Sequence, residues 1–289
     1  MSTGRVTATA SRLLLGARLR ALRLSAGLSM AQAAGALDVS PVTMRRLEEG
    51  RATVDADRLT ALLAAYGLDD PAETAELLAQ AERANGPGWW EGYRDVLPEW
   101  LADHIALEEH AQIIRVYAPA VIPELLQSPG YALALLRIQH PDDPPERLAR
   151  RLELLVGRQA VLERANPAPP TVWALVEEAT LRRRVGGAVV MREQFTHLRR
   201  LVERPGVTIR VMPLHTPHSA LLCGPVQMVR YQPSDLADRV LLRTLDGAEV
   251  SERPDVVRQY LMALDSAASV RDSLPITDWI SKWEERAVA

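Results

Sequence analysis

Residues 27–50 read GLSMAQAAGALDVSPVTMRRLEEG, and this stretch decides how the N-terminal part of the chain folds. Ser29 stands three residues before Gln32, an arrangement in which the two residues cap the first turn of a helix. Ser40 and Pro41 are the residue types that favour the start of a second helix. The stretch therefore predicts two short helices joined by a tight turn, which is the pattern of a helix-turn-helix.

Apolar residues at helical spacing flank this stretch on both sides. The face that precedes it is formed by Leu15, Leu19, Leu22 and Ala26. The helix that follows it is capped by Asp55, and its buried side is formed by Leu59, Leu62, Leu63 and Tyr66. We therefore expect four helices to pack into an all-α domain that covers residues 1–70.

The second helix of the motif has an inward and an outward side. We expect Met44 and Leu47 to point into the core, which leaves Val42, Thr43 and Arg46 outside near the helix start. In a helix-turn-helix these first residues reach base edges in the major groove. An arginine can bind guanine through two hydrogen bonds, and a valine can contact a thymine methyl group. We expect phosphate contacts from Ser40 and Arg51.

The distribution of charge agrees with a surface for DNA. Residues 1–51 contain eight arginines against three acidic residues, a local net charge of +5, although the formal net charge of the whole chain is −3. Phosphate contacts require such a local basic face. We expect double-stranded DNA to be a partner.

Length and composition limit the protein class. A chain of 289 residues is long enough for about two domains. The lone Cys223 excludes an internal disulfide. We find neither an apolar run of the roughly 18 residues that a membrane span needs nor the apolar core of a signal peptide. We therefore expect a cytoplasmic protein without a membrane partner.

Residues 13–68 resemble the Xre family, the lambda and 434 repressor type of DNA-binding domain. The resemblance rests on the order of the four helices and on Leu47-Glu48-Glu49-Gly50, which matches the family's Leu-Glu-x-Gly. It implies a structural ion pair between Arg23 and Glu48. It also places the family's base-contacting positions on Pro41, Val42 and Arg46, with Thr43 and Arg45 adjacent.

Two positions depart from that family. Asp38 stands where relatives usually have glycine, but aspartate tolerates the left-handed conformation better than most residues. Met30 stands where many relatives carry a phosphate-binding glutamine, so we expect Gln32 or the helix N-terminus to replace that contact. Because this class reads two half-sites about 34 Å apart, the resemblance implies a homodimer.

A connection follows at residues 71–88. Pro71 opens a further helix that ends near Gly86, after which Gly86-Pro87-Gly88 breaks the chain. Four large aromatic residues come next: Trp89, Trp90, Tyr93 and Trp100. They either pack the join between two domains or form a surface for a ligand or a partner.

Residues 89–289 are expected to form a larger mixed α/β (α+β) domain. Helices are predicted at 98–114, 145–164, 191–202, 254–267 and 277–286, with a further one after the turn at 128–130. The apolar side of the helix at 145–164 is expected to contain Leu148, Leu152, Leu155, Val156 and Leu162. The segment with Pro119 and Pro123 is expected to be extended. Strands are predicted at 171–179, 207–214, 225–231 and 239–245.

This second part resembles the C-terminal domain of a WhiJ-like group of actinobacterial regulators, a domain of unknown function described as antitoxin-like. The resemblance is carried by Trp89-Trp90, residues 97–100, residues 122–127, Glu178 with Leu181 and Arg182, and residues 207–214. It implies that the domain binds a small protein encoded by a neighbouring gene. The chain departs at Glu124, where the family commonly has glycine, and at residues 241–243, where Leu-Leu-Arg replaces the family's Tyr-x-Glu.

Evidence for an enzyme is weak in the sequence. The spacing of His215, His218 and Cys223 permits two or three metal ligands, but no second cluster accompanies them. Glu177 and Glu178 are neighbours at a strand end, so they should face opposite ways. His104 and Glu108 share a helix face with His110 near by, and we expect that face to be solvated. We find no phosphate-binding loop, dinucleotide-binding glycine pattern or nucleophile elbow. We expect no catalytic residues, no metal and no cofactor.

These expectations combine in one hypothesis: a sequence-specific DNA-binding transcriptional regulator whose C-terminal domain senses a partner protein or a small ligand. The first alternative is an antitoxin-like protein that sequesters a small partner protein and autoregulates its operon. The second is an enzyme in the α/β domain.

Overall fold

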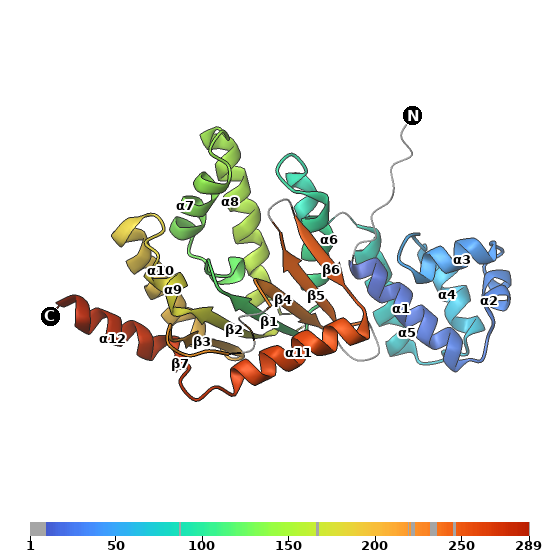
Figure 1. Ribbon diagram of the computed structural model, residues 1–289. Coiled ribbons are helices and arrows are strands. Elements are labelled where there is room, and N and C mark those ends of the chain that lie inside the picture. Colours follow the sequence, from blue (N-terminus) through green and yellow to red (C-terminus); the bar gives the residue numbers. More distant parts are fainter. Residues whose placement is uncertain are drawn as a thin grey trace. The chain divides into compact units, whose positions relative to one another are not determined.

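The computed structural model describes residues 10–86, 88–165, 168–218, 220, 223–231, 236–244 and 247–288 (Figure 1). The chain forms two compact units. The first contains the described residues up to Gly92, Glu99–His110 and the described part of Tyr231–Ala237. The second contains Tyr93–Pro98 and the described residues of 111–230 and 238–289. Among all these residues, no helix has the length and apolar character that crossing a membrane requires.

The first unit is helical. Its helices are α1 (Ala10–Ser25), α2 (Met30–Ala36), α3 (Pro41–Glu48), α4 (Ala56–Ala65), α5 (Pro71–Asn85) and α6 (Glu99–Glu108), with the 3-10 helix η1 (Trp89–Tyr93) before α6. Leu19 of α1, Met44 of α3 and Leu59 of α4 lie in one fully buried core. Leu77 and Ala81 of α5 pack into the same core. Residues 71–85, which the sequence assigns to a connection, are therefore part of the helical bundle.

The second unit is built on a seven-stranded mixed sheet with the order β6-β5-β4-β1-β2-β3-β7. The strands are β1 (Ile113–Ala118), β2 (Thr171–Glu177), β3 (Val207–Met212), β4 (Val226–Arg230), β5 (Arg239–Arg243), β6 (Ala248–Ser251) and β7 (Leu274–Pro275). β1, β2 and β3 are parallel, whereas β4 is antiparallel to both β1 and β5. One end of the sheet therefore contains the last residues of β1, β2, β3 and β5 and the first residues of β4. We call this end of the sheet the carboxyl edge.

Helices cover both faces of the sheet. They are α7 (Pro129–Gln139), α8 (Pro145–Gln159), α9 (Glu178–Arg182), α10 (Gly187–Val202), α11 (Pro254–Ala268) and α12 (Ile276–Val288), with the 3-10 helices η2 (Glu124–Leu126) and η3 (Ala160–Leu162). On one face, Val257 and Leu264 of α11 pack in a core with Tyr117, Leu175 and Met228 of the sheet. Figure 1 shows α7, α8 and α10 on the other side of the sheet. The predicted fold class, an all-α domain followed by a mixed α/β domain, is confirmed.

The structure corrects several predicted elements. The helix predicted at 98–114 ends at Glu108, because Ile113 already begins β1, the strand between β2 and β4. The short strands β6 and β7 were not predicted from the sequence. In α8 the buried side includes Leu154, whereas Val156 of the predicted apolar side is exposed.

Candidate DNA-recognition site

Local contacts fix the start of α3. The Ser40 hydroxyl accepts a hydrogen bond from the backbone N–H of Thr43 at 3.1 Å, and its oxygen lies 2.9 Å from the Thr43 hydroxyl oxygen. Pro41 occupies the first turn, where its missing N–H costs nothing. Asp38, in the turn before, has a φ of 52°, a left-handed conformation that few residues other than glycine tolerate. The expected turn thus forms without glycine.

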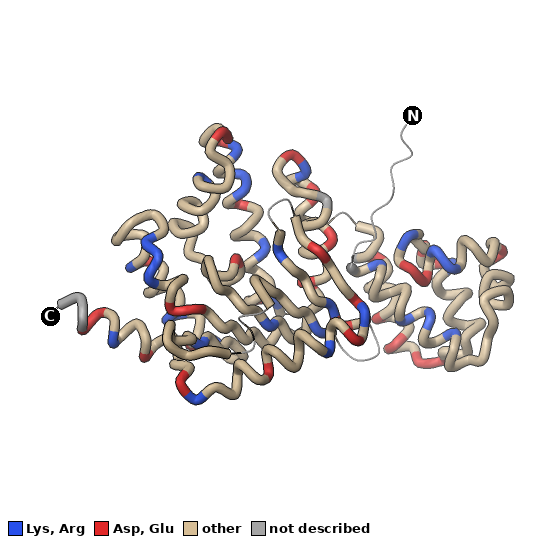
Figure 2. The backbone as a smooth tube through the Cα atoms, in the orientation of Figure 1, with Lys and Arg blue, Asp and Glu red and all other residues tan. Residues whose placement is uncertain are grey.

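One side of α3 is buried and the other is exposed. Met44 and Leu47 lie in the core, whereas the Val42 side of the helix faces solvent, with Val42 itself 67% exposed. We use the name recognition face for the exposed residues Pro41, Val42, Thr43, Arg45 and Arg46. Figure 2 shows the basic positions of this segment in blue. The recognition face presents the apolar side chain of Val42 and the guanidinium groups of Arg45 and Arg46, which are group types that read thymine and guanine in the major groove.

A buried ion pair holds α3 against α1. Arg23 donates from Nε to Glu48 Oε1 at 2.6 Å and from Nη2 to Glu48 Oε2 at 3.0 Å. Its Nη1 donates to the carbonyl of Leu28 at 2.9 Å. The two side chains are only 8% and 4% exposed. The hydrogen bond to Glu48 raises the pKa of Arg23, which keeps the guanidinium charged. The structure thus brings together the two residues that the resemblance paired.

A second feature, which sequence reasoning missed, sets the distance between α1 and α3. A Cβ atom on Gly16 would lie 2.5 Å from the carbonyl oxygen of Glu48 and 2.7 Å from that of Leu47. Any side chain at position 16 would therefore push α3 away from α1. A signal existed in the sequence, because a mid-helix glycine costs about 1 kcal/mol relative to alanine and needs a packing reason.

The residues expected to contact phosphates lie beside the recognition face in sequence. Arg51 is exposed, with its Nη1 atom 3.5 Å from the Glu49 carboxylate. At the start of α2, Ser29 and Gln32 form the expected capping box, in which the Gln32 side-chain oxygen accepts from the Ser29 N–H at 2.9 Å. Met30 packs against the helical core. The start of α2 and Arg51, three residues beyond the end of α3, are thus the groups of this segment that suit a DNA backbone.

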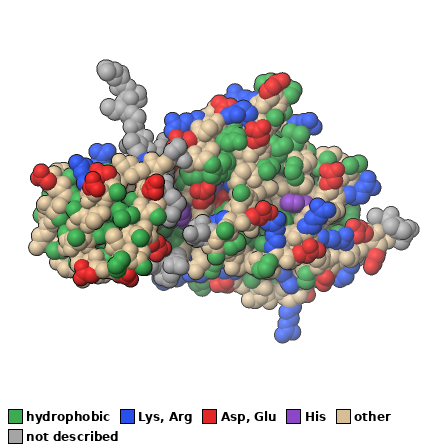
Figure 3. Space-filling model, turned by 180° about the vertical axis from the view of Figure 1, so that it is seen from behind, with side chains coloured by type: hydrophobic (Ala, Val, Ile, Leu, Met, Phe, Trp, Pro, Cys, Tyr) green, Lys and Arg blue, Asp and Glu red, His purple; other side chains and the backbone are tan. Residues whose placement is uncertain are grey.

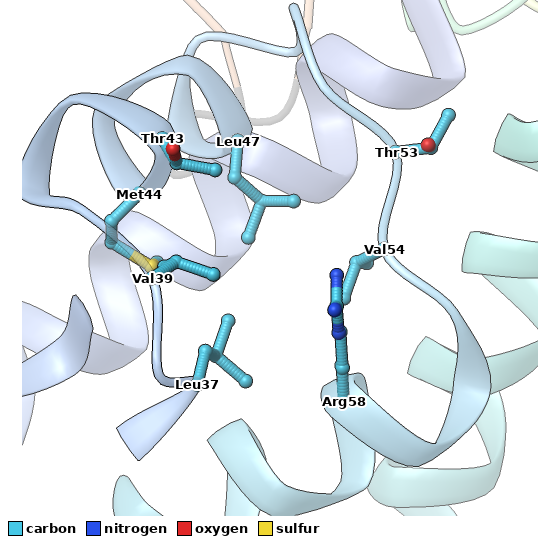
Figure 4. Close-up of a pocket in the computed structure, with 8 residues that line it drawn as sticks. All are labelled: Leu37, Val39, Thr43, Met44, Leu47, Thr53, Val54 and Arg58. Carbon is cyan, nitrogen blue, oxygen red and sulfur yellow. The ribbon is translucent and has the colours of Figure 1, made fainter. Parts of the chain in front are cut away.

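A small pocket opens next to α3. It is lined by Leu37, Val39, Thr43, Met44, Leu47, Thr53, Val54 and Arg58 (Figure 4). Its volume of about 30 Å³ is room for a water molecule or two rather than for an organic effector. We therefore do not assign it a ligand.

Polar side chains gather at the carboxyl edge of the second unit. Tyr117 donates its hydroxyl proton to Glu177 Oε1 at 2.9 Å, and His218 Nε2 lies 2.7 Å from the same oxygen. Cys223 packs beside this cluster, whereas His215 is exposed. Within the described residues, no group of three or more His, Cys, Asp or Glu side chains could hold a metal ion. The structure thus brings His218 to a carboxylate, whereas His215 of the same segment is exposed.

Comparison with known proteins places both units. The family model described as "Domain of unknown function (DUF5753)" matches residues 101–277. The chain belongs to this family. A model described as "Helix-turn-helix domain" matches residues 14–77, so the first unit carries a helix-turn-helix. The solved structure titled "Crystal structure of the clp gene regulator ClgR from C. glutamicum" matches at 31% identity, covering 27% of this chain and 96% of that chain with a TM-score of 0.21. No curated protein matches.

In the second unit, the two residues that depart from the expected sequence pattern, Glu124 and Arg243, lie side by side. Glu124 Oε1 lies 3.0 Å from Arg243 Nη1, although the two residues are far apart in the chain. The other oxygen of Glu124 binds Arg158, whose side chain is buried. Arg243 stands where the expected Tyr-x-Glu pattern has its glutamate, and Glu124 neutralises this arginine. The two substitutions together place opposite charges side by side.

The four aromatic residues are divided between the two units. Trp90 is buried, while Trp89 packs edge-on against it and donates its indole N–H to Glu109 at 2.6 Å. Tyr93 belongs to the second unit, where the guanidinium of Arg150 lies over its ring. Trp100 is partly buried on α6. Of these four candidate residues for a ligand or partner surface, Trp89 is the exposed one, whereas Tyr93 and Trp100 are partly buried.

The helix face with His104 and Glu108 is not solvated, contrary to expectation. Both residues are buried, and His104 Nε2 lies 3.5 Å from Glu108 Oε1. The helix forms as the spacing predicts, but α6 packs against α1, and His104 and Glu108 are buried. The neighbouring His110 lies 3.1 Å from the Ser11 hydroxyl of α1.

Proposed function

We propose that this DUF5753 protein is a sequence-specific DNA-binding transcriptional regulator and that its recognition face reads base edges in the major groove. One observation carries the proposal. The buried Arg23–Glu48 pair holds α3 against α1, while the recognition face on the other side of α3 stays exposed. Base readout needs this combination, because a side chain must be held in register to discriminate between bases.

The proposal assigns base contacts to Val42, Thr43, Arg45 and Arg46, with Pro41 packed at the helix start. Ser40 and Arg51 contact phosphates. The protein binds as a homodimer, because a single α3 reads only a half-site. The DUF5753 unit senses a protein partner or a small ligand and thereby shifts the population that is competent to bind the operator.

The test begins with genome-wide mapping of bound DNA, followed by mobility shifts on the mapped site. Arg46→Ala should weaken specific binding by about 1–3 kcal/mol and relax the preference at one base position. Arg51→Ala should weaken all sequences alike and lower the salt dependence by about one counterion.

Arg137→Ala is the matched control, because Arg137 is an exposed arginine of the second unit, on α7. This variant loses one positive charge outside the helix-turn-helix unit, so operator affinity should not change. Unchanged affinity in Arg46→Ala would mean that α3 does not read the DNA in this orientation.

A further inference from the structure

The outer side of β6 leaves backbone groups of the second unit without a partner strand. β6 pairs with β5 on one side, and among the described residues no strand pairs with its other side, which we call the open side of β6. Figure 1 shows β6 at the border of the sheet. On the face of this unit shown in Figure 3, acidic and basic side chains are interspersed, so that face does not present a charge of one sign to a macromolecule. Unpaired N–H and C=O groups of a border strand, in contrast, can receive another strand.

The two border strands of the sheet differ in how they resist such pairing. At the opposite border, β7 has only two residues and ends in Pro275, which has no N–H to donate. β6 has four residues and no proline, and the apolar side chain of Val250 at its centre is 50% exposed. Natural sheets use very short strands and prolines to prevent association at their borders. β7 has both forms of protection, whereas β6 lacks the proline.

Hydrogen bonds near the β5–β6 hairpin show which backbone groups face outward. The Thr244 N–H donates to the Gly247 carbonyl at 3.1 Å, so these two residues bond to each other across the hairpin. The Arg243 N–H instead donates away from β6, to the Pro225 carbonyl at 3.4 Å. In an antiparallel pair the two kinds of position alternate along the strand. Ala248, which lies opposite Arg243, therefore turns its N–H and C=O groups to the open side.

The same alternation assigns the rest of β6. Val250 has its backbone groups on the open side like Ala248, whereas Glu249 and Ser251 bond to β5. Glu249 and Ser251 lie opposite two β5 residues that pack in the core with α11, so their side chains share the α11 face of the sheet. The Val250 side chain lies on the other face.

Charge selects one way in which β6 can pair with a second copy of itself. Outward backbone groups must meet outward groups, so Val250 lies opposite either Ala248 or Val250 of the second copy. In the first register Glu249 lies opposite its own counterpart, and like charges directly opposite are destabilising. In the second register Glu249 lies opposite Ser251, and the two Val250 side chains pack together at a two-fold axis. Glu249 thus selects the register centred on Val250.

We propose that the open side of β6 pairs antiparallel with β6 of a second copy, centred on Val250, so that two seven-stranded sheets join into one. This interface deepens the proposed function and rests on it, because it names the surface through which the homodimer forms. The paired strand is short, so we expect a dimer that dissociates in the micromolar range and that operator DNA stabilises.

Sedimentation velocity of the full chain without DNA, at about 1–200 µM, measures the dimer. Val250→Pro removes the outward N–H but keeps the bonds to β5, because proline is tolerated where the N–H of a border strand faces solvent. It should weaken the dimer by about tenfold or more, since the two-fold axis doubles the loss. Ser251→Glu should also weaken the dimer and Ser251→Arg should strengthen it, each by about fivefold, because Glu249 lies opposite. Thermal unfolding checks that each variant folds.

Cysteine cross-linking locates the two-fold axis. Cys223→Ser removes the only cysteine of the chain. In that background Val250→Cys places two thiols on residues whose Cα atoms lie about 5.5 Å apart, a distance that a disulfide spans. Oxidation should therefore give a covalent dimer. Val189→Cys is the matched control, because Val189 is a 59% exposed valine of the same unit, on α10, and it should stay monomeric.

Each other outcome overturns the interface. A monomer throughout this concentration range would leave the open side of β6 to a strand of another protein. A dimer that Val250→Pro and both Ser251 variants leave unchanged, or equal cross-linking of the two cysteine variants, would place the dimer contact elsewhere. Operator binding separates the two proposals. If operator binding persists while the β6 dimer is not found, only the interface is lost, and if the β6 dimer forms but binds no mapped DNA, the proposed function itself fails.

Discussion

The Arg23–Glu48 pair offers a quantitative test of how α3 is held. Removing one partner leaves the other charge buried, which costs about 3–5 kcal/mol in comparable pairs. The high end applies to Arg23→Met, because both of its hydrogen bonds to Glu48 are lost and the carboxylate has only 4% exposure. Glu48→Met should cost less, because Arg23 keeps its bond to the Leu28 carbonyl.

The double variant Arg23→Met/Glu48→Met should lose much less free energy of unfolding than the two single variants lose together. Both charges are then gone, and two flexible apolar side chains occupy the space between α1 and α3. The coupling energy of this cycle should exceed about 2 kcal/mol, a value reached by residues in direct contact in one hydrogen-bonded network.

Calorimetry of the full chain provides the assay. The transition of the first unit is recognised because operator DNA raises its midpoint. A loss of 3 kcal/mol should lower that midpoint by about 12 °C or more, at about 4–8 °C per kcal/mol for a unit of this size. Single losses below about 1 kcal/mol, or additive losses in the double variant, would refute the view that this pair fixes α3.

Three further predictions concern other sites. Asp38→Gly should stabilise the first unit by about 0.5–1 kcal/mol, because it relieves a left-handed φ, whereas a lowered urea midpoint would show that the aspartate side chain matters more. Glu124→Ala should cost about 3 kcal/mol in urea unfolding, since it removes a carboxylate from buried Arg158, but Arg243→Ala should cost less than about 1 kcal/mol because that arginine is more exposed. Equal losses would contradict this ranking. Burial raises the pKa of the Cys223 thiol, so less thiolate exists at neutral pH; iodoacetamide should label the native chain more slowly than the urea-unfolded chain, as followed by mass spectrometry. Equal rates would disprove the shift.

The helix-turn-helix could be predicted because its determinants are local. Ser29 and Gln32 cap one helix, Ser40 caps the next, and each signal acts within three residues of its partner. The need for glycine at position 16 could not be predicted, because the atom that excludes a side chain there, the carbonyl oxygen of Glu48, belongs to another helix.

The sheet was less predictable because its determinants are distant. Ile113 was assigned to a helix by its apolar neighbours, but it pairs with Thr171 and Arg230. The cluster around Glu177 was missed for the same reason, since strand alternation says which way a side chain points but not that His218 will meet it. Only the folded chain reveals that the replacements at positions 124 and 243 lie side by side.

The way the chain passes between its two units has a consequence for biosynthesis. Tyr93–Pro98 belongs to the second unit, although the helices that precede and follow it in the sequence belong to the first unit. Asp95 is held by Arg150, which lies 55 residues further along the chain. At about 5–20 residues per second, the ribosome needs roughly 3–11 seconds to add those residues, so Asp95 is synthesised well before its partner exists. Helices α1 to α5 can thus pack during translation, while the segment that joins α5 to α6 reaches its final place only after α8 has emerged.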